Sequence, residues 1–278
     1  MRWWKAFLVS VLCVLLVGGS VSAVAQGVSM TTRVVAGRTY LAVRAESAHS
    51  GLPLLVVLHG RGMDVRNMAT RTGFLRFAEN GLADVVYPAG IGQSWNAGSG
   101  CCGLAARRHV DDTAFVQAVV ADATRAFGTD PRRIYLVGYS NGGRLAFHLA
   151  CVSPATFAAF ATYGAAPPTT CANRAAAGLS ALVAAGTADR ILQHGAQVVQ
   201  HATTTWRALN SCPAHSSTRR TGPAVVTTWR GCHGGAAVQS IVFPGLTHAW
   251  PSSVAGLMWN FLSRQVGHGT GVSAVSAR

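Results

Sequence analysis

The sequence predicts an α/β protein built on a doubly wound, mostly parallel β-sheet. Apolar runs of strand length recur along the chain, amphipathic stretches of helical length separate them, and a strand, a sharp turn and a helix follow one another around Ser140. Half of the 278 residues are hydrophobic and only 12% are charged, so one large core can be buried and a disordered chain is excluded. We therefore expect a single domain.

The expected strands and helices alternate along the chain. Residues 33–44 are strand-like with a hairpin break at Gly37-Arg38, and residues 54–58 form an apolar run typical of a central strand. A Gly- and Ser-rich loop is expected from residue 88 to residue 103. The other expected strands are 84–88, 134–137, 157–163, 182–185 and 236–243, and the expected helices are 67–80, 113–127, 144–150, 196–209 and 254–262.

The first 25 residues have the features of a signal peptide. A positively charged start, Met1-Arg-Trp-Trp-Lys5, precedes the apolar residues 6–17, and Ala23-Val-Ala25 offers a cleavage site before Gln26. The apolar run is short for a transmembrane helix, and an uncleaved anchor is the alternative. We expect secretion, a mature domain over residues 26–266, and a small, polar, disordered tail over residues 267–278.

Cysteine usage predicts disulfides in the mature chain. Cys13 lies in the apolar run and is set aside, and an even number of cysteines in an exported protein favours disulfides over zinc, since no C-x-x-C pair is present. Cys212 and Cys232 flank a polar, Arg-, Thr- and Gly-rich segment, so we expect that pair to bridge it. The other bridges are expected to join the region of Cys101 and Cys102 to Cys151 and Cys171.

The formal net charge of +14 comes from 23 basic and 9 acidic residues. The arginines are scattered, never more than two in a row, and no helix-turn-helix, zinc-finger or aromatic RNA-binding signature accompanies them, so we expect no nucleic-acid partner. A basic surface that associates loosely with an anionic cell envelope is the simpler interpretation. We expect a monomer without metal or cofactor.

The segment Gly138-Tyr-Ser-Asn-Gly142 fits the pattern G-x-S-x-G. Between a strand and a helix, this pattern is typical of a nucleophile elbow, a tight turn that presents a serine hydroxyl at the sheet edge. The glycines are needed because the serine backbone is strained and a Cβ on either side would collide across the turn. Ser140 is therefore the candidate nucleophile.

A serine hydroxyl needs a base within hydrogen-bond reach and a third group that orients the base. Asp189 is the only carboxylate after Ser140 and follows a strand directly, and His248 follows a strand and a Pro-Gly turn. The order Ser, Asp, His is that of the α/β-hydrolase fold. The four nearest carboxylates before Ser140 are better explained as helix caps or turn residues, namely Asp111, Asp112, Asp122 and Asp130. The other histidines after Asp189 lie at surface, cysteine-flanked or tail positions, namely His194, His201, His215, His233 and His268.

Catalysis also needs donors for the developing oxyanion. We expect the backbone N–H groups of Asn141 and Arg61 to form this oxyanion hole, with Gly62 as the alternative to Arg61. Trp95 and Trp250 are candidate substrate-binding aromatics, and packing against the loops is the equal alternative for both. His59 is expected to shape the loop rather than to act as a base.

Several motifs in the same order resemble the secreted polyhydroxybutyrate depolymerase/feruloyl esterase family of the α/β-hydrolase superfamily. They are Leu58-His-Gly60, Trp95-Asn-Ala-Gly-Ser-Gly-Cys-Cys-Gly103, Val110-Asp-Asp112, Asp130-Pro-Arg-Arg133, Gly138-Tyr-Ser-Asn-Gly-Gly143, Gly186-Thr-Ala-Asp189 and Thr247-His-Ala-Trp-Pro251. The resemblance implies a cofactor-independent serine esterase acting on small or oligomeric esters. The alternatives are an acyltransferase and a non-catalytic cell-surface binding protein on the same scaffold.

Overall fold

A computed structural model describes residues 27–98, 100–167, 171 and 173–267. Within these ranges the strands form one ten-stranded sheet in the order β1-β2-β4-β3-β5-β6-β7-β10-β9-β8. Neighbouring strands from β4 to β10 run parallel, whereas β1, β2, β9 and β8 pair antiparallel at the two edges. The strands are β1 Val28–Val35, β2 Arg38–Ala45, β3 Leu54–Leu58, β4 Asp84–Pro88, β5 Ile134–Tyr139, β6 Ala159–Tyr163, β7 Ser180–Gly186, β8 Ser217–Thr221, β9 Ala224–Trp229 and β10 Val238–Phe243.

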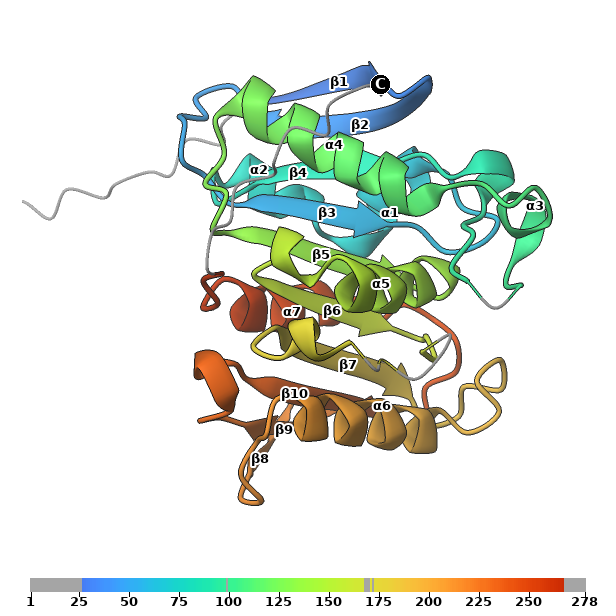
Figure 1. The fold of residues 1–278 in the computed structure, drawn as a ribbon, viewed down its shortest axis with the longest axis vertical. Coiled ribbons are helices and arrows are strands. Elements are labelled where there is room, and N and C mark those ends of the chain that lie inside the picture. The colour runs from blue at the N-terminus through green and yellow to red at the C-terminus, as the bar shows by residue number, and fades with distance from the viewer. Residues whose placement is uncertain (1–26, 99, 168–170, 172, 268–278) are drawn as a thin grey trace, which may run out of the picture.

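Helices cover both faces of the sheet, as the predicted doubly wound fold requires. Figure 1 shows α4, α5 and α6 on the face toward the viewer and α1, α2 and α7 behind the sheet. Each face has its own cluster of buried side chains. The helices are α1 Val65–Thr72, α2 Leu75–Glu79, α3 Gly103–Arg107, α4 Asp112–Phe127, α5 Asn141–Val152, α6 Gly195–Leu209 and α7 Val254–Leu262, with single 3₁₀ turns at Ile91–Gln93, Pro154–Thr156, Arg174–Ala176 and His233–Gly235.

The burial of each strand explains which strands the sequence made easy to predict. Every residue of β3, β4, β6 and β7 is buried, because a central parallel strand is covered on both faces and therefore has a continuous apolar sequence. Strand β9 alternates between buried and half-buried residues, and β8 is exposed throughout. The parallel centre was confirmed, whereas the β8–β9 hairpin at the edge was not predicted.

One other local prediction was wrong, and one short helix was not predicted. The expected helix over residues 67–80 is two helices, because Gly73 ends α1 in the left-handed region at φ 77° and no helix continues through that conformation. The expected loop after residue 88 is confirmed in its described residues, apart from a single 3₁₀ turn at Ile91–Gln93, and the short helix α3 that begins at Gly103 was not predicted.

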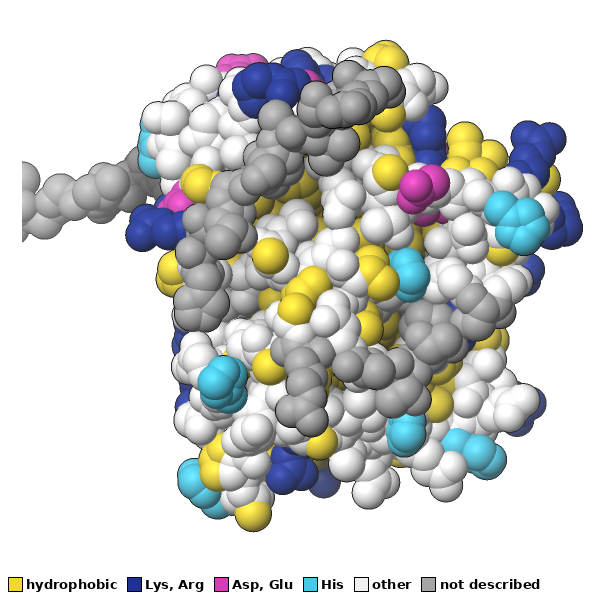
Figure 2. Space-filling view, in the orientation of Figure 1, with side chains coloured by type: hydrophobic (Ala, Val, Ile, Leu, Met, Phe, Trp, Pro, Cys, Tyr) yellow, Lys and Arg dark blue, Asp and Glu magenta, His cyan; other side chains and the backbone are white. Residues whose placement is uncertain are grey.

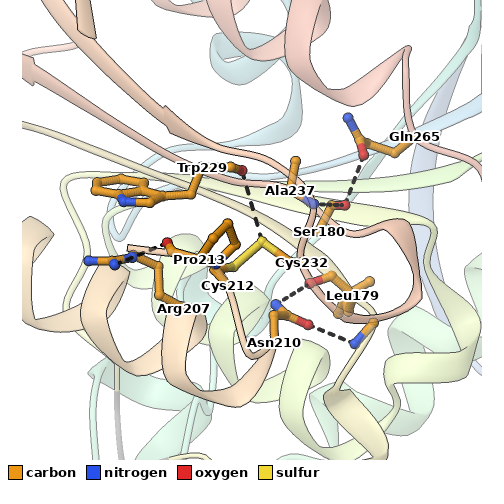
Figure 3. Close-up of a disulfide and its surroundings, with 11 residues drawn as sticks. Leu179, Ser180, Arg207, Asn210, Cys212, Pro213, Trp229, Cys232, Ala237 and Gln265 are labelled. Carbon is orange, nitrogen blue, oxygen red and sulfur yellow. Dashed lines mark hydrogen bonds between the residues drawn. A yellow bond between two sulfur atoms is a disulfide. The ribbon is translucent and has the colours of Figure 1, made fainter. Parts of the chain in front are cut away.

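The cysteine pairing was predicted in part. The Cys212–Cys232 disulfide is confirmed and joins the end of α6 to the turn after β9 (Figure 3). The expected link from the 101–102 region to Cys151 and Cys171 is wrong, because Cys151 pairs with Cys171 and Cys101 pairs with Cys102. Both of these bridges are local and leave the two regions unconnected by a disulfide.

Basic side chains are scattered over the described surface. Figure 2 shows arginine side chains in separate places around the rim of one face, with few acidic side chains between them. None of the helices in the described ranges has the length and apolar character needed to span a membrane. The predicted signal peptide and almost all of the predicted tail lie outside the described residues.

Candidate active site

Ser140 occupies the turn between β5 and α5, in a backbone conformation that few residues adopt. Its φ and ψ are 52° and −118°, and its N–H donates to the carbonyl oxygen of Tyr163 at 2.9 Å. A Cβ on Gly142 would lie 2.5 Å from the carbonyl oxygens of Leu58 and His59, and one on Gly138 would collide with Gly142 itself. The elbow therefore requires glycine at both positions, as the motif predicted.

The structure brings Ser140, His248 and Asp189 into one chain of hydrogen bonds. His248 Nε2 lies 2.9 Å from Ser140 Oγ, and His248 Nδ1 lies 2.7 Å from Asp189 Oδ2. The Asp189 side chain is fully buried and that of His248 is 14% exposed. Because the carboxylate oxygen only accepts, Nδ1 carries the proton and Nε2 is free to accept the serine proton.

Two neighbouring parallel strands, β7 and β10, carry the acid and the base at their carboxyl ends. The loops after them are joined, since Ala188 N–H donates to the carbonyl oxygen of Leu246 at 3.0 Å. Asp189 Oδ1 accepts from the N–H groups of Ile191 and Leu192 at 3.0 and 3.1 Å. These two bonds fix the carboxylate and leave Oδ2 for the histidine.

Tyr139 supports His248 from the other side and was missed by the sequence analysis. Its hydroxyl donates to the backbone carbonyl oxygen of His248 at 2.6 Å, and the two rings stack with centroids 5.4 Å apart. Burial raises the pKa of Tyr139, so the phenol stays protonated and remains a donor. The signal that could have found it is its position directly before the nucleophile, at the end of a buried strand.

The loop after β3 lies against the elbow. Leu58 pairs with Gly138 in adjacent parallel strands, so the residues that follow each strand end side by side. Gly62 N–H donates to the carbonyl oxygen of Gln93 at 2.8 Å and is occupied. Within the described ranges nothing accepts from the N–H groups of Arg61 or Asn141. Between the two expected alternatives, the free donor is therefore that of Arg61.

The Asn141 side chain binds the elbow to a third loop. Its Oδ1 accepts from the Trp95 N–H at 2.7 Å, and its Nδ2 donates to the Trp95 carbonyl oxygen at 3.1 Å. The Trp95 indole N–H in turn donates to the carbonyl oxygen of His59 at 2.8 Å. The elbow, the β3–α1 loop and the loop after β4 are thus held together by side chains that are almost fully buried.

Trp95 therefore has a different position from the one expected. It is fully buried, and its ring lies 4.7 Å from that of His59 and beneath the Arg38 guanidinium. The prediction that Trp95 contacts substrate is wrong, because no part of the indole is accessible. The packing alternative is correct for this tryptophan.

His59 has the structural role that was expected. Its Nε2 accepts from the Gly90 N–H at 3.0 Å, and its Nδ1 lies 2.9 Å from the carbonyl oxygen of Gly60. Burial lowers the pKa of His59, which keeps the ring neutral with its proton on Nδ1. The histidine joins the loops after β3 and β4.

Asp112 is not the helix cap that the sequence suggested. Asp111 caps α4 by accepting from Ala114 N–H at 2.9 Å, whereas Asp112 is buried 2.8 Å from an Arg38 nitrogen. Its second oxygen accepts from the Asn96 N–H at 2.7 Å, so this pair anchors the residue next to Trp95. Burial raises the pKa of Asp112.

Trp250 lines a cavity of about 470 Å³ beside the elbow. Its indole N–H donates to the Thr72 carbonyl oxygen at 3.1 Å, and its ring meets that of Tyr139 edge-on at 5.5 Å. The residues that line the cavity come from the β3–α1 loop, from α1, from the end of β5 and from the loop after His248. They are Gly62, Met63, Asn67, Arg71, Thr72, Tyr139 and Trp250. Of the two predicted substrate-binding tryptophans, only Trp250 has an accessible position.

A second cavity of about 570 Å³ lies between α5 and α6. His148, His194 and His201 line it together with Trp206 and the Cys151–Cys171 disulfide. Across the part of the chain that the structure describes, no three His, Cys, Asp or Glu side chains are arranged to hold a metal ion.

Sequence comparison finds similarity to hydrolases. Residues 93–212 match the Dienelactone hydrolase family model, a segment that holds Ser140 and Asp189 but ends before His248. The chain is 34% identical over 135 residues to NocK from Nocardia uniformis subsp. tsuyamanensis, which is named as an esterase. It is 26% identical over 220 residues to the bifunctional acetylxylan esterase/xylanase XynS20E from Neocallimastix patriciarum.

These matches cover 46% and 76% of this chain but only 39% and 31% of the two relatives, so the chain spans less than half of either. Among solved structures, an acetyl xylan esterase from Aspergillus awamori superposes with a TM-score of 0.66 at 14% identity, over 85% of this chain and 99% of that chain. The narrower resemblance to polyhydroxybutyrate depolymerases and feruloyl esterases stays a prediction. The sheet order and the superposition show that the chain has the α/β-hydrolase fold, and its sequence is similar to those of esterases.

Proposed function

We propose that the protein is a serine hydrolase of carboxylic esters, with Ser140 as nucleophile, His248 as general base and Asp189 as the group that orients the base. The observation that carries the proposal is the hydrogen-bonded chain from Asp189 through His248 to Ser140 Oγ at 2.7 and 2.9 Å. The esterase names of the relatives agree with it.

In this mechanism His248 Nε2 takes the proton of Ser140 as the hydroxyl oxygen attacks the ester carbonyl. The oxyanion accepts hydrogen bonds from the N–H groups of Arg61 and Asn141, both unused by the described residues. His248 then gives the proton to the leaving alcohol. Water, activated by the same histidine, releases the acid and restores the serine.

The substrates we propose are acetyl, feruloyl or 3-hydroxybutyrate-type oligomeric esters. They follow from the motif resemblance together with the partly exposed Trp250 next to the elbow. We also propose that the protein acts outside the cytoplasm, since its three disulfides suit an oxidising compartment.

The test is hydrolysis of p-nitrophenyl acetate, methyl ferulate and soluble 3-hydroxybutyrate oligomers by the oxidised protein and by Ser140→Ala. Removing a triad serine should lower kcat by about 10⁶-fold. The preferred ester would then define the substrate class. If wild type and variant are equally active, or both inactive, the triad assignment is wrong and a binding function becomes the better account.

A further inference from the structure

The cavity lined by Trp250 is formed in part by residues that adjoin the reacting groups, and the proposed mechanism gives it no role. Tyr139, in its wall, directly precedes Ser140 and stacks on His248. Gly62, also in its wall, directly follows Arg61. An ester whose carbonyl lies at Ser140 Oγ therefore has one of its two halves next to this opening.

The aromatic walls suit a flat group. The Tyr139 and Trp250 rings contact each other edge to face at an interplanar angle of 77°, so they form two walls set nearly at right angles. The Trp250 N–H is already bonded to Thr72, which leaves the indole as apolar surface. The thioether of Met63, which adapts to the shape of its partner, lines the same space.

One side chain that lines the cavity is positively charged. Arg71 is exposed, and it is the charged residue among the side chains that line the cavity. Within the described ranges its guanidinium has no carboxylate or carbonyl partner. Asp64, which caps the start of the same helix, is engaged, since its two oxygens accept from Asn67 N–H and Asn67 Nδ2 at 2.8 and 3.1 Å.

We propose that this cavity binds a flat, carboxylate-bearing half of the ester, with Arg71 as the residue that selects it. A guanidinium presents two parallel N–H donors that match the two oxygens of a carboxylate. The inference rests on the proposed esterase activity and adds the substrate class to it: anionic esters over neutral esters of the same shape.

The test uses two pairs of esters that differ only in a carboxylate or a carboxamide. The acyl pair is methyl 4-carboxybenzoate and methyl 4-carbamoylbenzoate; the alcohol pair is 4-acetoxybenzoate and 4-acetoxybenzamide. The readout is the carboxylate-to-carboxamide ratio of kcat/KM, measured for wild type, Arg71→Gln, Arg71→Lys and the control Arg66→Gln. Arg66 is an exposed arginine of the same helix that does not line the cavity.

We expect Arg71→Gln to lower the ratio about tenfold for one pair, and that pair identifies the half of the ester that enters the cavity. Arg71→Lys should retain part of the preference, Arg66→Gln all of it, and added salt should weaken it. Unchanged ratios for both pairs in an active Arg71→Gln would overturn the inference while sparing the proposed function. A wild type that hydrolyses p-nitrophenyl acetate but none of the four esters would overturn the inference alone, and one that hydrolyses none of these esters would refute both.

Discussion

Replacing Asn141 with alanine should slow ester hydrolysis by more than the accompanying loss of stability explains. The side chain makes two hydrogen bonds to the Trp95 backbone, at 2.7 and 3.1 Å, and fixes the elbow against the loop after β4. The variant keeps the backbone N–H that we assign to the oxyanion hole. It removes only what holds that N–H in place, so kcat should fall more than KM changes.

The structure sets the size of both effects. The alanine leaves the buried Trp95 N–H unpaired, at about 1–3 kcal/mol, and removes one of the two hydrogen bonds to the Trp95 carbonyl oxygen, which still accepts from the Cys102 N–H at 3.3 Å. The free energy of unfolding should therefore fall by about 3 kcal/mol and Tm by about 6–12 °C. Losing an oxyanion donor outright costs about 10²–10³ in kcat. A displaced donor should therefore cost about 10- to 100-fold.

Asn210 offers a matched control away from the site. Its Oδ1 accepts from the Gly178 N–H at 2.7 Å and its Nδ2 donates to the Leu179 carbonyl oxygen at 3.0 Å, as Figure 3 shows for Leu179. Asn210→Ala removes the same two kinds of bond and should lower Tm comparably with no change in kcat. Thermal unfolding and steady-state kinetics at one temperature below both transitions separate the effects. Equal kcat values for the two variants would refute the positioning role of Asn141.

Further predictions concern pH, a disulfide and the elbow. Burial lowers the pKa of His59 and of His148, so as the pH falls the unfolded chain takes up these protons before the folded chain does. The free energy of unfolding should therefore be constant above about pH 6.5 and decrease below it. Urea melts of wild type and His148→Gln would show the contribution of His59, and no decrease in the variant would mean that His59 is not held neutral. Breaking the Cys212–Cys232 bridge, which spans 20 residues, by a double alanine variant should cost about 3 kcal/mol in urea melts with kcat unchanged, and a loss of kcat would tie the bridge to the site. Gly142→Ala places a Cβ 2.5 Å from the His59 carbonyl oxygen, so the variant should lose stability and activity. A folded variant with normal activity would contradict the elbow geometry.

The elements that the sequence predicted best are those with local causes. The run of residues 54–58 is apolar because a central parallel strand is buried on both faces, and β3 has the same limits. The elbow was recognisable because Gly138 and Gly142 are dictated by atoms within one turn and the adjoining strand. Asp189 and His248 follow strands that prove to be neighbours in the sheet.

The predictions that were wrong depended on tertiary contacts. Trp95 lies on a long loop, and only the folded structure shows that its indole is enclosed by His59 and Arg38. Asp112 has the sequence of a helix cap, yet the ion pair that buries it comes from Arg38 on a distant strand. Spacing along the chain carries no information about such partners.

The edge hairpin was not predicted, and the cysteine pairing was predicted only in part, for related reasons. The turn Gly222-Pro223 and the alternation of β9 were a readable signal, which the polar composition of the segment obscured. Cysteine pairing follows from which loops meet in the fold, and 15 connectivities of six cysteines are possible from sequence alone. Only the Cys212–Cys232 bridge, which closes one self-contained segment, was predictable.

The most direct test of the account is covalent labelling with a fluorophosphonate, which reacts with an activated serine, followed by peptide mass spectrometry. We predict one adduct per chain, on Ser140, together with loss of esterase activity in step with labelling. Ser140→Ala should take up no label, and His248→Gln should be labelled slower by orders of magnitude, because the base at 2.9 Å is gone. A label on another serine, or equal labelling of wild type and His248→Gln, would contradict the assignment of Ser140 as an activated nucleophile.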